Sequence, residues 1–310
     1  MRILVTGGAG FIGSHVAEHL LGAGHEVAVL DDLSTGHRAN VPAGAAFYDC
    51  DIRDERLAAI LGEFRPEVIS HHAAQMSVRV SVQRPRLDAS INVEGSVHLL
   101  ECAVKARVRK VIYASTGGAV YGEPAYLPCD EGHPVAPLCQ YGISKHTVEH
   151  YLALYAHLYG LDYTVLRYPN VYGPRQDPEG EAGVVAIFAR RMLAARPVTI
   201  YGDGTQERDF VHVGDVARAT LAALERGDRA LVNLGSGSGT SVQAIFDALV
   251  QITGYERSAE HGPQRLGEVY RIYLTGERAR ELLEWSPQVS LEAGLRETVA
   301  WVRANEGRQA

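Results

Sequence analysis

The stretch Ile3-Leu4-Val5-Thr6-Gly7-Gly8-Ala9-Gly10-Phe11-Ile12-Gly13 decides the fold of this chain. It starts as a short apolar run typical of a buried strand, passes through a glycine-rich turn, and enters a helix-patterned segment that reaches Gly24. Glycines permit a tight turn and let backbone N–H groups approach a pyrophosphate at the positive end of the helix. The spacing G-x-x-G-x-x-G is one residue looser than the common dinucleotide-binding pattern, but strand, turn and helix follow in the required order.

An acidic pair, Asp31-Asp32, ends the next strand-like run at 26–30. An acid about 20 residues after the glycine turn is where a dinucleotide-binding unit holds its ribose. A carboxylate there accepts hydrogen bonds from the ribose hydroxyls and repels a 2′-phosphate, which favours NAD over NADP. Arg38 could instead bind a 2′-phosphate, but Asp31 at the strand tip is the stronger determinant.

Strand-like and helical segments alternate through the first half of the chain. Strand-like runs recur at 46–50, 67–70, 110–114 and 162–166, and helical segments separate them at about 54–64, 85–107 and 140–159. This alternation predicts an α/β fold with a doubly wound parallel (Rossmann) sheet, whose ligands bind at the carboxyl ends of the strands. We expect an NAD-binding domain at 1–172 and a smaller C-terminal substrate-binding α/β domain at 173–310, with segments near 209–235 returning to the first.

The segment Tyr141-Gly142-Ile143-Ser144-Lys145 opens a helix-patterned run that ends near Gly160. Residues four apart share a helix face, so Tyr141 and Lys145 are expected to point the same way. A phenol titrates near pH ~10, and a neighbouring cation favours its phenolate. The pair is therefore a candidate proton shuttle, although Tyr and Lys occur at this spacing on many helices.

The overall composition describes an ordinary globular protein of 310 residues with a net charge of -7. The acidic balance argues against a nucleic-acid partner. Four scattered cysteines without a C-x-x-C pair are typical of reduced thiols. No apolar run approaches the ~18 residues of a membrane span, and the strand-like start leaves no room for a signal peptide. We expect a cytoplasmic protein without a membrane partner.

The ordered series of motifs resembles the extended short-chain dehydrogenase/reductase family, and within it the nucleotide-sugar epimerases of the UDP-glucose 4-epimerase type. The resemblance covers nearly the whole chain and accounts for the looser glycine spacing. The motifs are the glycine turn at 6–13, Asp51-Ile52, His72-Ala73-Ala74-Gln75, Asn92, Tyr141-x-x-x-Lys145, Arg167-Tyr168-x-Asn170 and Arg208-Asp209-Phe210.

The resemblance implies a tightly bound NAD cofactor and a UDP-sugar substrate, with no metal. The implied NAD-binding residues are Gly7, Gly10, Phe11, Ile12, Asp31, Asp32, Ser34, Thr35, Asp51, Ile52, Ala73, Ala74, Gln75, Asn92, Ser115, Tyr141, Lys145, Tyr168 and Val171. The implied nucleotide-binding residues are Asn170, Val184, Tyr201, Arg208, Arg265 and Glu268. A guanidinium suits a diphosphate because it donates to two oxygens at once.

The implied reaction is the 4-epimerisation of a nucleotide sugar through a transient 4-keto intermediate. Tyr141 would take the proton of the sugar 4-hydroxyl while C4 gives its hydride to NAD, and both return after the sugar turns over. UDP-glucose and UDP-galactose are the expected pair, and UDP-GlcNAc or UDP-glucuronate are alternatives. Ile272 is a candidate gate for N-acetylated substrates. Family members form dimers through two long helices, so a homodimer is expected.

One position departs from the family pattern. The family places a Ser or Thr four residues before the Tyr of its V-Y-G motif, to bind the sugar 4-oxygen, and this chain has Gly117 there. We expect the adjacent Thr116 to take over part of this catalytic role, or water to fill the gap. Related 4,6-dehydratases carry an Asp-Glu pair on the same loop, whereas this chain has Gly118-Ala119, so no acid for dehydration is visible.

Three other functions compete with an epimerase. His146-Thr147-Val148-Glu149-His150 matches the H-x-x-E-H pattern of helical zinc sites, although no third ligand is evident and solvent-facing histidines are the simpler interpretation. An NAD-sensing regulator would keep the glycine turn but would not need Tyr141 and Lys145. A dehydrogenase that releases NADH would accumulate it with substrate, whereas an epimerase would not.

Overall fold

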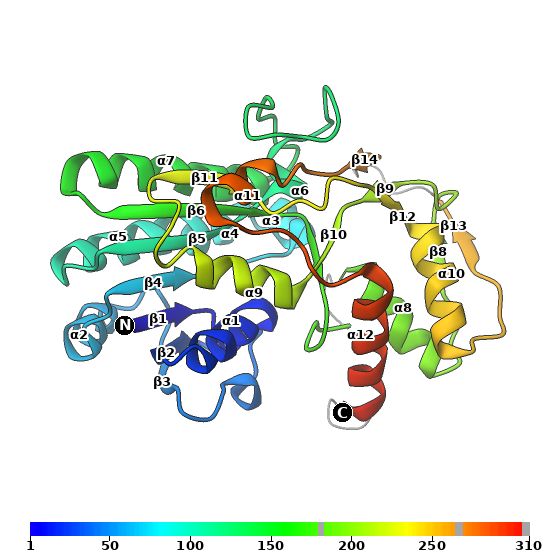
Figure 1. The fold of residues 1–310 in the computed structure, drawn as a ribbon, viewed down its shortest axis with the longest axis horizontal. Coiled ribbons are helices and arrows are strands. Elements are labelled where there is room, and N and C mark those ends of the chain that lie inside the picture. The colour runs from blue at the N-terminus through cyan, green and yellow to red at the C-terminus, as the bar shows by residue number, and fades with distance from the viewer. Residues whose placement is uncertain (179–182, 264–268, 306–310) are drawn as a thin grey trace.

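A computed structural model describes residues 1–178, 183–263 and 269–305 of the chain. Its centre is a seven-stranded sheet in the order β11-β6-β5-β4-β1-β2-β3 (Figure 1). All neighbouring strands in it run parallel, which confirms the predicted doubly wound α/β fold. The strands are β1 (Arg2–Thr6), β2 (Glu26–Asp31), β3 (Ala46–Asp49), β4 (Val68–His71), β5 (Lys110–Thr116), β6 (Asp162–Tyr168) and β11 (Ala230–Asn233).

Helices cover both faces of this sheet (Figure 1). On one face, α1 (Phe11–Gly22) and α9 (Val213–Ala222) enclose a core that includes Val5, Val29 and Leu166. On the other face, α2 (Arg56–Phe64), α5 (Gly95–Lys105) and α7 (Gln140–Tyr159) enclose Leu4, Ile69 and Tyr113. Because strand side chains alternate between the two faces, each buried strand supplies both cores.

The segment predicted as one helix at 85–107 is interrupted. It consists of α4 (Pro85–Ala89), the π-helical turn η2 (Ser90–Glu94) and α5. Such a turn lets one extra residue into the helix, and it is common at functional sites. Here it carries Asn92, whose side chain is buried. The other short helices are η1 (Arg38–Asn40), α3 (Val78–Gln83), α6 (Gly117–Val120) and α11 (Glu277–Leu283).

The C-terminal part packs around α8 (Val184–Leu193), α10 (Val242–Thr253) and α12 (Leu291–Asn305), which lie beside the sheet in Figure 1. Ser241 caps α10 by accepting a hydrogen bond from Ala244 N. Three small sheets accompany these helices: β7 (Asn170–Tyr172) with β10 (Phe210–His212), β8 (Thr199–Tyr201) with β13 (Glu260–Gly262), and β9 (Glu207–Arg208) with β12 (Thr240–Ser241) and β14 (Arg271–Ile272).

The chain crosses between these two parts more than once. After β10 it returns to the large sheet, where β11 pairs with β6. The division at residue 172 remains a prediction. Within the described residues, no helix is both long enough and apolar enough to cross a membrane.

Candidate functional site

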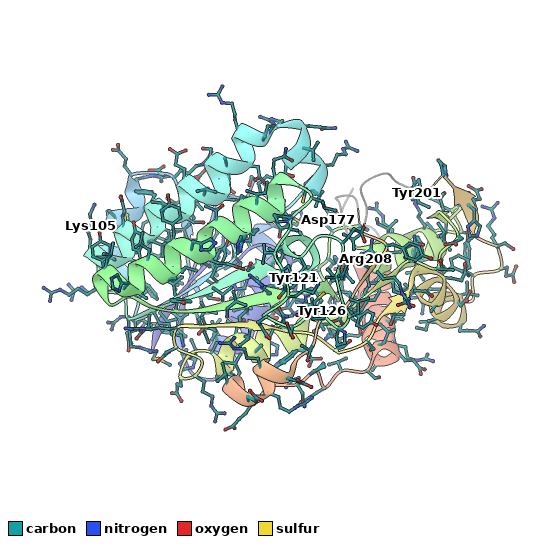
Figure 2. The ribbon with its side chains drawn as sticks, turned by 90° about the horizontal axis from the view of Figure 1, so that it is seen from above. Lys105, Tyr121, Tyr126, Asp177, Tyr201 and Arg208 are labelled. Carbon is teal, nitrogen blue, oxygen red and sulfur yellow. The ribbon has the colours of Figure 1, made fainter. Side chains whose placement is uncertain are left out.

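The predicted cofactor and catalytic residues gather at the carboxyl-end edge of the large sheet, because parallel strands end on the same side. Thr6 pairs with His71, and Ser115 and Thr116 pair with Arg167 and Tyr168. In Figure 2, Arg208 and Asp177 lie between the sheet and the C-terminal helices, Tyr201 lies farther out, and Lys105 lies at the opposite end.

The glycine turn is closely packed against the loop that follows β4. Gly7 has a φ of +67°, and a Cβ added there would lie 2.6 Å from Ala73 N. A Cβ on Gly13 would lie 2.2 Å from Gly7 O. No side chain caps Gly10 at the start of α1, so the first N–H groups of this helix remain available to an anion.

Asp31 holds the glycine turn in shape from the end of β2. Its carboxylate accepts hydrogen bonds from Ala9 N and Leu33 N, both at 2.9 Å. Burial raises the pKa of Asp31, and the two N–H groups oppose this change. Each oxygen keeps a second lone pair that can accept from a ribose hydroxyl. Asp32 is exposed and accepts from Ser34 N and Ser34 Oγ, while Thr35 is exposed beside them.

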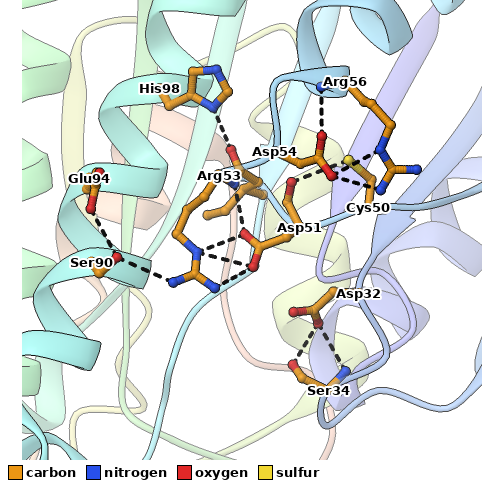
Figure 3. Close-up of polar contacts among 11 residues, drawn as sticks. Asp32, Ser34, Cys50, Asp51, Arg53, Asp54, Arg56, Ser90, Glu94 and His98 are labelled. Carbon is orange, nitrogen blue, oxygen red and sulfur yellow. Dashed lines mark hydrogen bonds and ion pairs between the residues drawn. The ribbon is translucent and has the colours of Figure 1, made fainter.

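The carboxylate of Asp51 is bound by Arg53, two residues later in the chain (Figure 3). Arg53 Nε donates to both carboxylate oxygens, and Arg53 Nη2 lies 2.5 Å from Asp51 Oδ2. Arg53 Nη1 reaches Ser90 Oγ at 3.3 Å, which in turn donates to Glu94. The hydrogen bond from Arg53 lowers the pKa of Asp51. Ile52, between them, is 3% exposed.

Gln75 and Asn92 are joined by a buried acid that sequence reasoning missed. Gln75 N donates to Asn92 Oδ1 at 2.8 Å, and Asn92 Nδ2 donates to Gln75 O at 2.9 Å. The side-chain amides of both residues also donate to Asp88 Oδ1, at 2.9 and 3.1 Å. Asp88 is 1% exposed. Ala74 is half-buried on the same loop.

Tyr141 and Lys145 lie in the first turns of α7, as predicted. The sequence predicted a lowered pKa for Tyr141, and the net change in this structure has the opposite direction. Burial raises the pKa of Tyr141 above its ordinary value, Cys139 and Asp88 add to this effect, and a hydrogen bond with the Thr116 side chain opposes it. The cost of desolvating a phenolate exceeds the benefit of the groups around it.

Lys145 is a buried amine, 3% exposed. Its Nζ lies 4.3 Å from the centre of the Tyr113 ring, a cation–π contact. Burial lowers the pKa of Lys145 to about 7, although Glu149 and Asp88 raise it. The amine therefore changes charge near neutral pH.

Thr116 directly precedes Gly117, and its side chain acts on Tyr141 by lowering the pKa of that phenol. That the Thr116 hydroxyl replaces the family's usual one remains a prediction. A Cβ on Gly117 would lie 2.3 Å from Leu274 Cδ1, so any larger residue there requires the Leu274 side chain to shift. Ile272, the candidate gate, is buried in the cluster that contains Leu274 and is 3% exposed; its gating role remains a prediction.

A buried ion pair links the helix of Tyr141 to two strand ends. Arg167 Nε and Nη2 donate to Glu149 Oε1 and Oε2 at 2.9 and 2.6 Å. Ser115 Oγ donates to Glu149 Oε1 at 2.6 Å, so Ser115 is engaged inside the protein. Burial alone would raise the pKa of Glu149, but hydrogen bonds from Arg167, His146 and Ser115 lower it to about 2.

The zinc-like pattern H-x-x-E-H therefore serves another purpose. Its glutamate, Glu149, is bound by Arg167, and His146 Nδ1 lies 2.8 Å from Glu149 Oε2. His150 is exposed and contacts His146. Over the described ranges, no group of three or more potential ligands could hold a metal ion.

The remaining predicted cofactor residues lie at the end of β6 and in β7. Tyr168 is 6% exposed, and its ring stacks on that of His72 with centroids 6.4 Å apart. Val171, half-buried, pairs with Val211 of β10. Asn170 N donates to Asp209 O, and the Asn170 side chain faces Gly118 beside Thr116.

The predicted substrate residues are only partly brought together. Val184 begins α8, Tyr201 is 40% exposed at the end of β8, and Arg208 lies in β9. Arg208 Nη1 donates to Glu207 O and Tyr270 O. Arg265 and Glu268 lie outside the described residues.

The residues at this edge fit a dinucleotide. The turn at Gly7 and Gly13 has no space for a Cβ, Asp31 can accept from a ribose, and the N-terminus of α1 carries no side-chain cap. These features suit backbone contact with a pyrophosphate and ribose recognition. The described part of the site contains the donors and acceptors that NAD requires.

Comparisons with known proteins agree with this geometry. Residues 3–235 match the model of the NAD dependent epimerase/dehydratase family. The UDP-glucose 4-epimerase of Mycolicibacterium smegmatis is 46% identical over 309 residues, which cover 98% of this chain and 99% of that protein.

Two solved structures are similar over almost their whole length. The UDP-glucose 4-epimerase of Thermotoga maritima, solved with UDP-glucose, is 50% identical with a TM-score of 0.97, and the match covers 99% of this chain and 100% of that one. The UDP-glucose 4-epimerase of Thermus thermophilus, solved with NAD, is 47% identical with a TM-score of 0.93, covering 98% and 99%.

Proposed function

This chain belongs to the NAD dependent epimerase/dehydratase family, and we propose that it catalyses the NAD-dependent 4-epimerisation of a UDP-sugar, with UDP-glucose and UDP-galactose as the pair. One observation carries the proposal. Tyr141 and Lys145, on one helix, lie with Thr116 of β5 at the same sheet edge as the glycine turn.

The chemistry follows from these side chains. Tyr141 accepts the proton of the sugar 4-hydroxyl as the C4–H bond breaks, which leaves a 4-keto sugar. When bound, NAD supplies the reversible acceptor for the C4 hydride. Thr116 donates a hydrogen bond to the Tyr141 oxygen and stabilises its anion. The charge of Lys145 assists, because a nearby cation favours a phenolate. Return of the hydride to the opposite face of C4, and of the proton from Tyr141 to the 4-oxygen, gives the epimer.

The binding roles also remain proposals. We assign the adenosine half of NAD to Asp31, Asp32, Ser34, Thr35, Asp51 and Ile52, the pyrophosphate to the turn at 7–13, and the nicotinamide half to the edge formed by 73–75, Asn92, Ser115, Tyr168 and Val171. The nucleotide of the substrate is assigned to Asn170, Val184, Tyr201, Arg208, Arg265 and Glu268.

The exposed surface of α7 is suited to a homodimer interface, and we place the protein in the cytoplasm. Leu154, Leu158 and Tyr159 are 47%, 56% and 57% exposed, and a second copy could cover them. Cys50, Cys102, Cys129 and Cys139 form no disulfide, which suits a reducing compartment. A monodisperse monomer in light scattering would contradict the dimer.

The direct test is incubation with UDP-glucose, UDP-GlcNAc and UDP-glucuronate, following each 4-epimer by NMR and NADH by absorbance. We expect UDP-galactose from UDP-glucose with almost no net NADH. Tyr141→Phe should abolish turnover, whereas Tyr151→Phe, on the same helix, should not. Full activity of Tyr141→Phe would refute the assignment. Net NADH formation would indicate a dehydrogenase, and NAD binding without turnover a regulator.

A further inference from the structure

Asp88 is a buried carboxylate beside the predicted catalytic helix. It belongs to α4, which packs against α7. Its Oδ1 accepts hydrogen bonds from the neutral amides of Gln75 and Asn92. Asn92 Nδ2 also donates to Ser144 Oγ at 3.1 Å, the residue before Lys145. Two hydrogen bonds therefore connect Asp88 to α7 within one turn of Tyr141.

A buried carboxylate is costly unless a cation compensates its charge. Lys145 is the buried cation on which Asp88 acts, together with Glu149. Glu149 already pairs with Arg167 through two hydrogen bonds. The remaining groups that face Lys145 are neutral at pH 7: the Tyr113 ring lies against its Nζ, and burial lowers the pKa of His71 and His72. Glu149 raises the pKa of Lys145 more than Asp88 does, but Glu149 also neutralises Arg167, so Asp88 is the second buried anion that balances Lys145.

We propose that Asp88 is the buried counter-ion of Lys145 and the positioning residue that holds the Gln75 and Asn92 amides in the cofactor site. This inference rests on the proposed function only where it concerns the pH dependence of catalysis. The electrostatic pairing itself is a property of the chain alone.

Removing the negative charge of Asp88 should change the pKa values of Lys145 and Tyr141 in a known direction. Asp88 raises the pKa of Lys145 and that of Tyr141. The other groups that act on Tyr141 are Cys139, which raises its pKa, and Thr116, which lowers it. In Asp88→Asn both pKa values should therefore fall. Activity that needs a charged Lys145 and an ionised Tyr141 should keep its bell-shaped pH profile but move as a whole to lower pH.

The chain offers a clean spectroscopic test because its lysines are Lys105, Lys110 and Lys145. Uniform ¹³C-lysine labelling should give three ε-CH₂ signals, and Lys145→Arg identifies the one from Lys145. We expect the pKa of Lys145 to fall by about one pH unit or more in Asp88→Asn. Asparagine can still accept both amide hydrogen bonds through its oxygen, so the substitution removes charge with little change in shape.

A matched control is Asp228→Asn. Asp228 Oδ1 lies 2.5 Å from Lys110 Nζ, so this variant should shift Lys110 and leave Lys145 unchanged. Asp88→Glu should restore the Lys145 titration because it restores the charge. If Asp88→Asn does not fold, Asp88→Ser provides the same measurement. An unchanged Lys145 titration in a folded Asp88 variant would overturn the proposal.

Activity measurements separate the two proposals. If the wild type turns over no UDP-sugar, the proposed function fails while the NMR titration still decides the pairing. If the wild type is active and Asp88→Asn loses rate without a shift of its pH profile, the counter-ion role is wrong and Asp88 acts through structure alone.

Discussion

Arg167 and Glu149 form a bidentate ion pair inside the protein, with side chains 3% and 5% exposed and an Nη2–Oε2 distance of 2.6 Å. The pair joins β6 to α7 and also receives Ser115 from the end of β5. Arg167 Nη1 continues the network to Tyr121 OH, which donates to Asn233 Oδ1 of β11. One buried network therefore joins the three elements that carry predicted site residues, β5, β6 and α7, to β11.

The first prediction concerns Glu149→Gln. The folded state lowers the pKa of Glu149 from 4.5 to about 2, which corresponds to about 3 kcal/mol of stability at pH 7. Because this pKa is depressed, the contribution is complete above pH 4.5 and is lost as the pH falls toward 2. Urea unfolding should show that the variant loses much of its free energy of unfolding at pH 7 and much less near pH 2.5.

The control for this prediction is Glu292→Gln. Glu292 pairs with Arg296 on the surface, with side chains 71% and 60% exposed. An exposed pair contributes at most about 1 kcal/mol, so this variant should unfold almost as the wild type does. Equal losses in the two variants would show that burial does not set the strength of the Glu149 pair.

The second prediction concerns Thr116→Val, which removes the hydroxyl that binds Tyr141 while keeping the side-chain shape. A hydrogen bond to a developing charge is typically about 1.5–3 kcal/mol, so kcat should fall about 10- to 100-fold. Thr116→Ser should retain most of the activity. Steady-state kinetics of UDP-glucose epimerisation measures both, and unchanged turnover of Thr116→Val would exclude a catalytic role for this hydroxyl.

The third prediction concerns Gly117→Ser, which introduces the family's usual residue. Its Cβ would lie 2.3 Å from Leu274 Cδ1, and Leu274 is only 1% exposed. Overpacking of this kind costs about 1–3 kcal/mol, so thermal unfolding should occur at a lower temperature. In a Leu274→Ala background, the same substitution should cost much less. Additive losses in this double-mutant cycle would contradict a direct clash.

The fourth prediction concerns Arg53→Met, which releases the Asp51 carboxylate. Because Arg53 orients Asp51 at the adenosine end of the proposed NAD site (Figure 3), NAD should bind about three- to tenfold more weakly. Arg56→Met is the matched control, since Arg56 pairs with Asp54 at the same two-residue spacing but is 65% exposed. Calorimetric titration of the NAD-free protein distinguishes them, and equal NAD affinities would remove Arg53 from the site.

Features that depend on local pattern could be predicted from the sequence. Alternating apolar runs predicted the parallel sheet, because strand and helix periods are properties of neighbouring residues. The glycine turn predicted a close backbone approach, and Gly7 and Gly13 have it. The spacing of four residues predicted that Tyr141 and Lys145 lie one turn apart on a helix, and both lie near the start of α7.

The pKa values and charge partners of the site depend on tertiary contacts. Asp88 and Lys145 are far apart in sequence, and so are Gly117 and Leu274, so no local period links them. The direction of the Tyr141 pKa followed from burial, which raises it, and the sequence had suggested the opposite from the nearby lysine alone. Desolvation and long-range contacts depend on which segments the fold packs together, and a one-dimensional pattern does not contain that information.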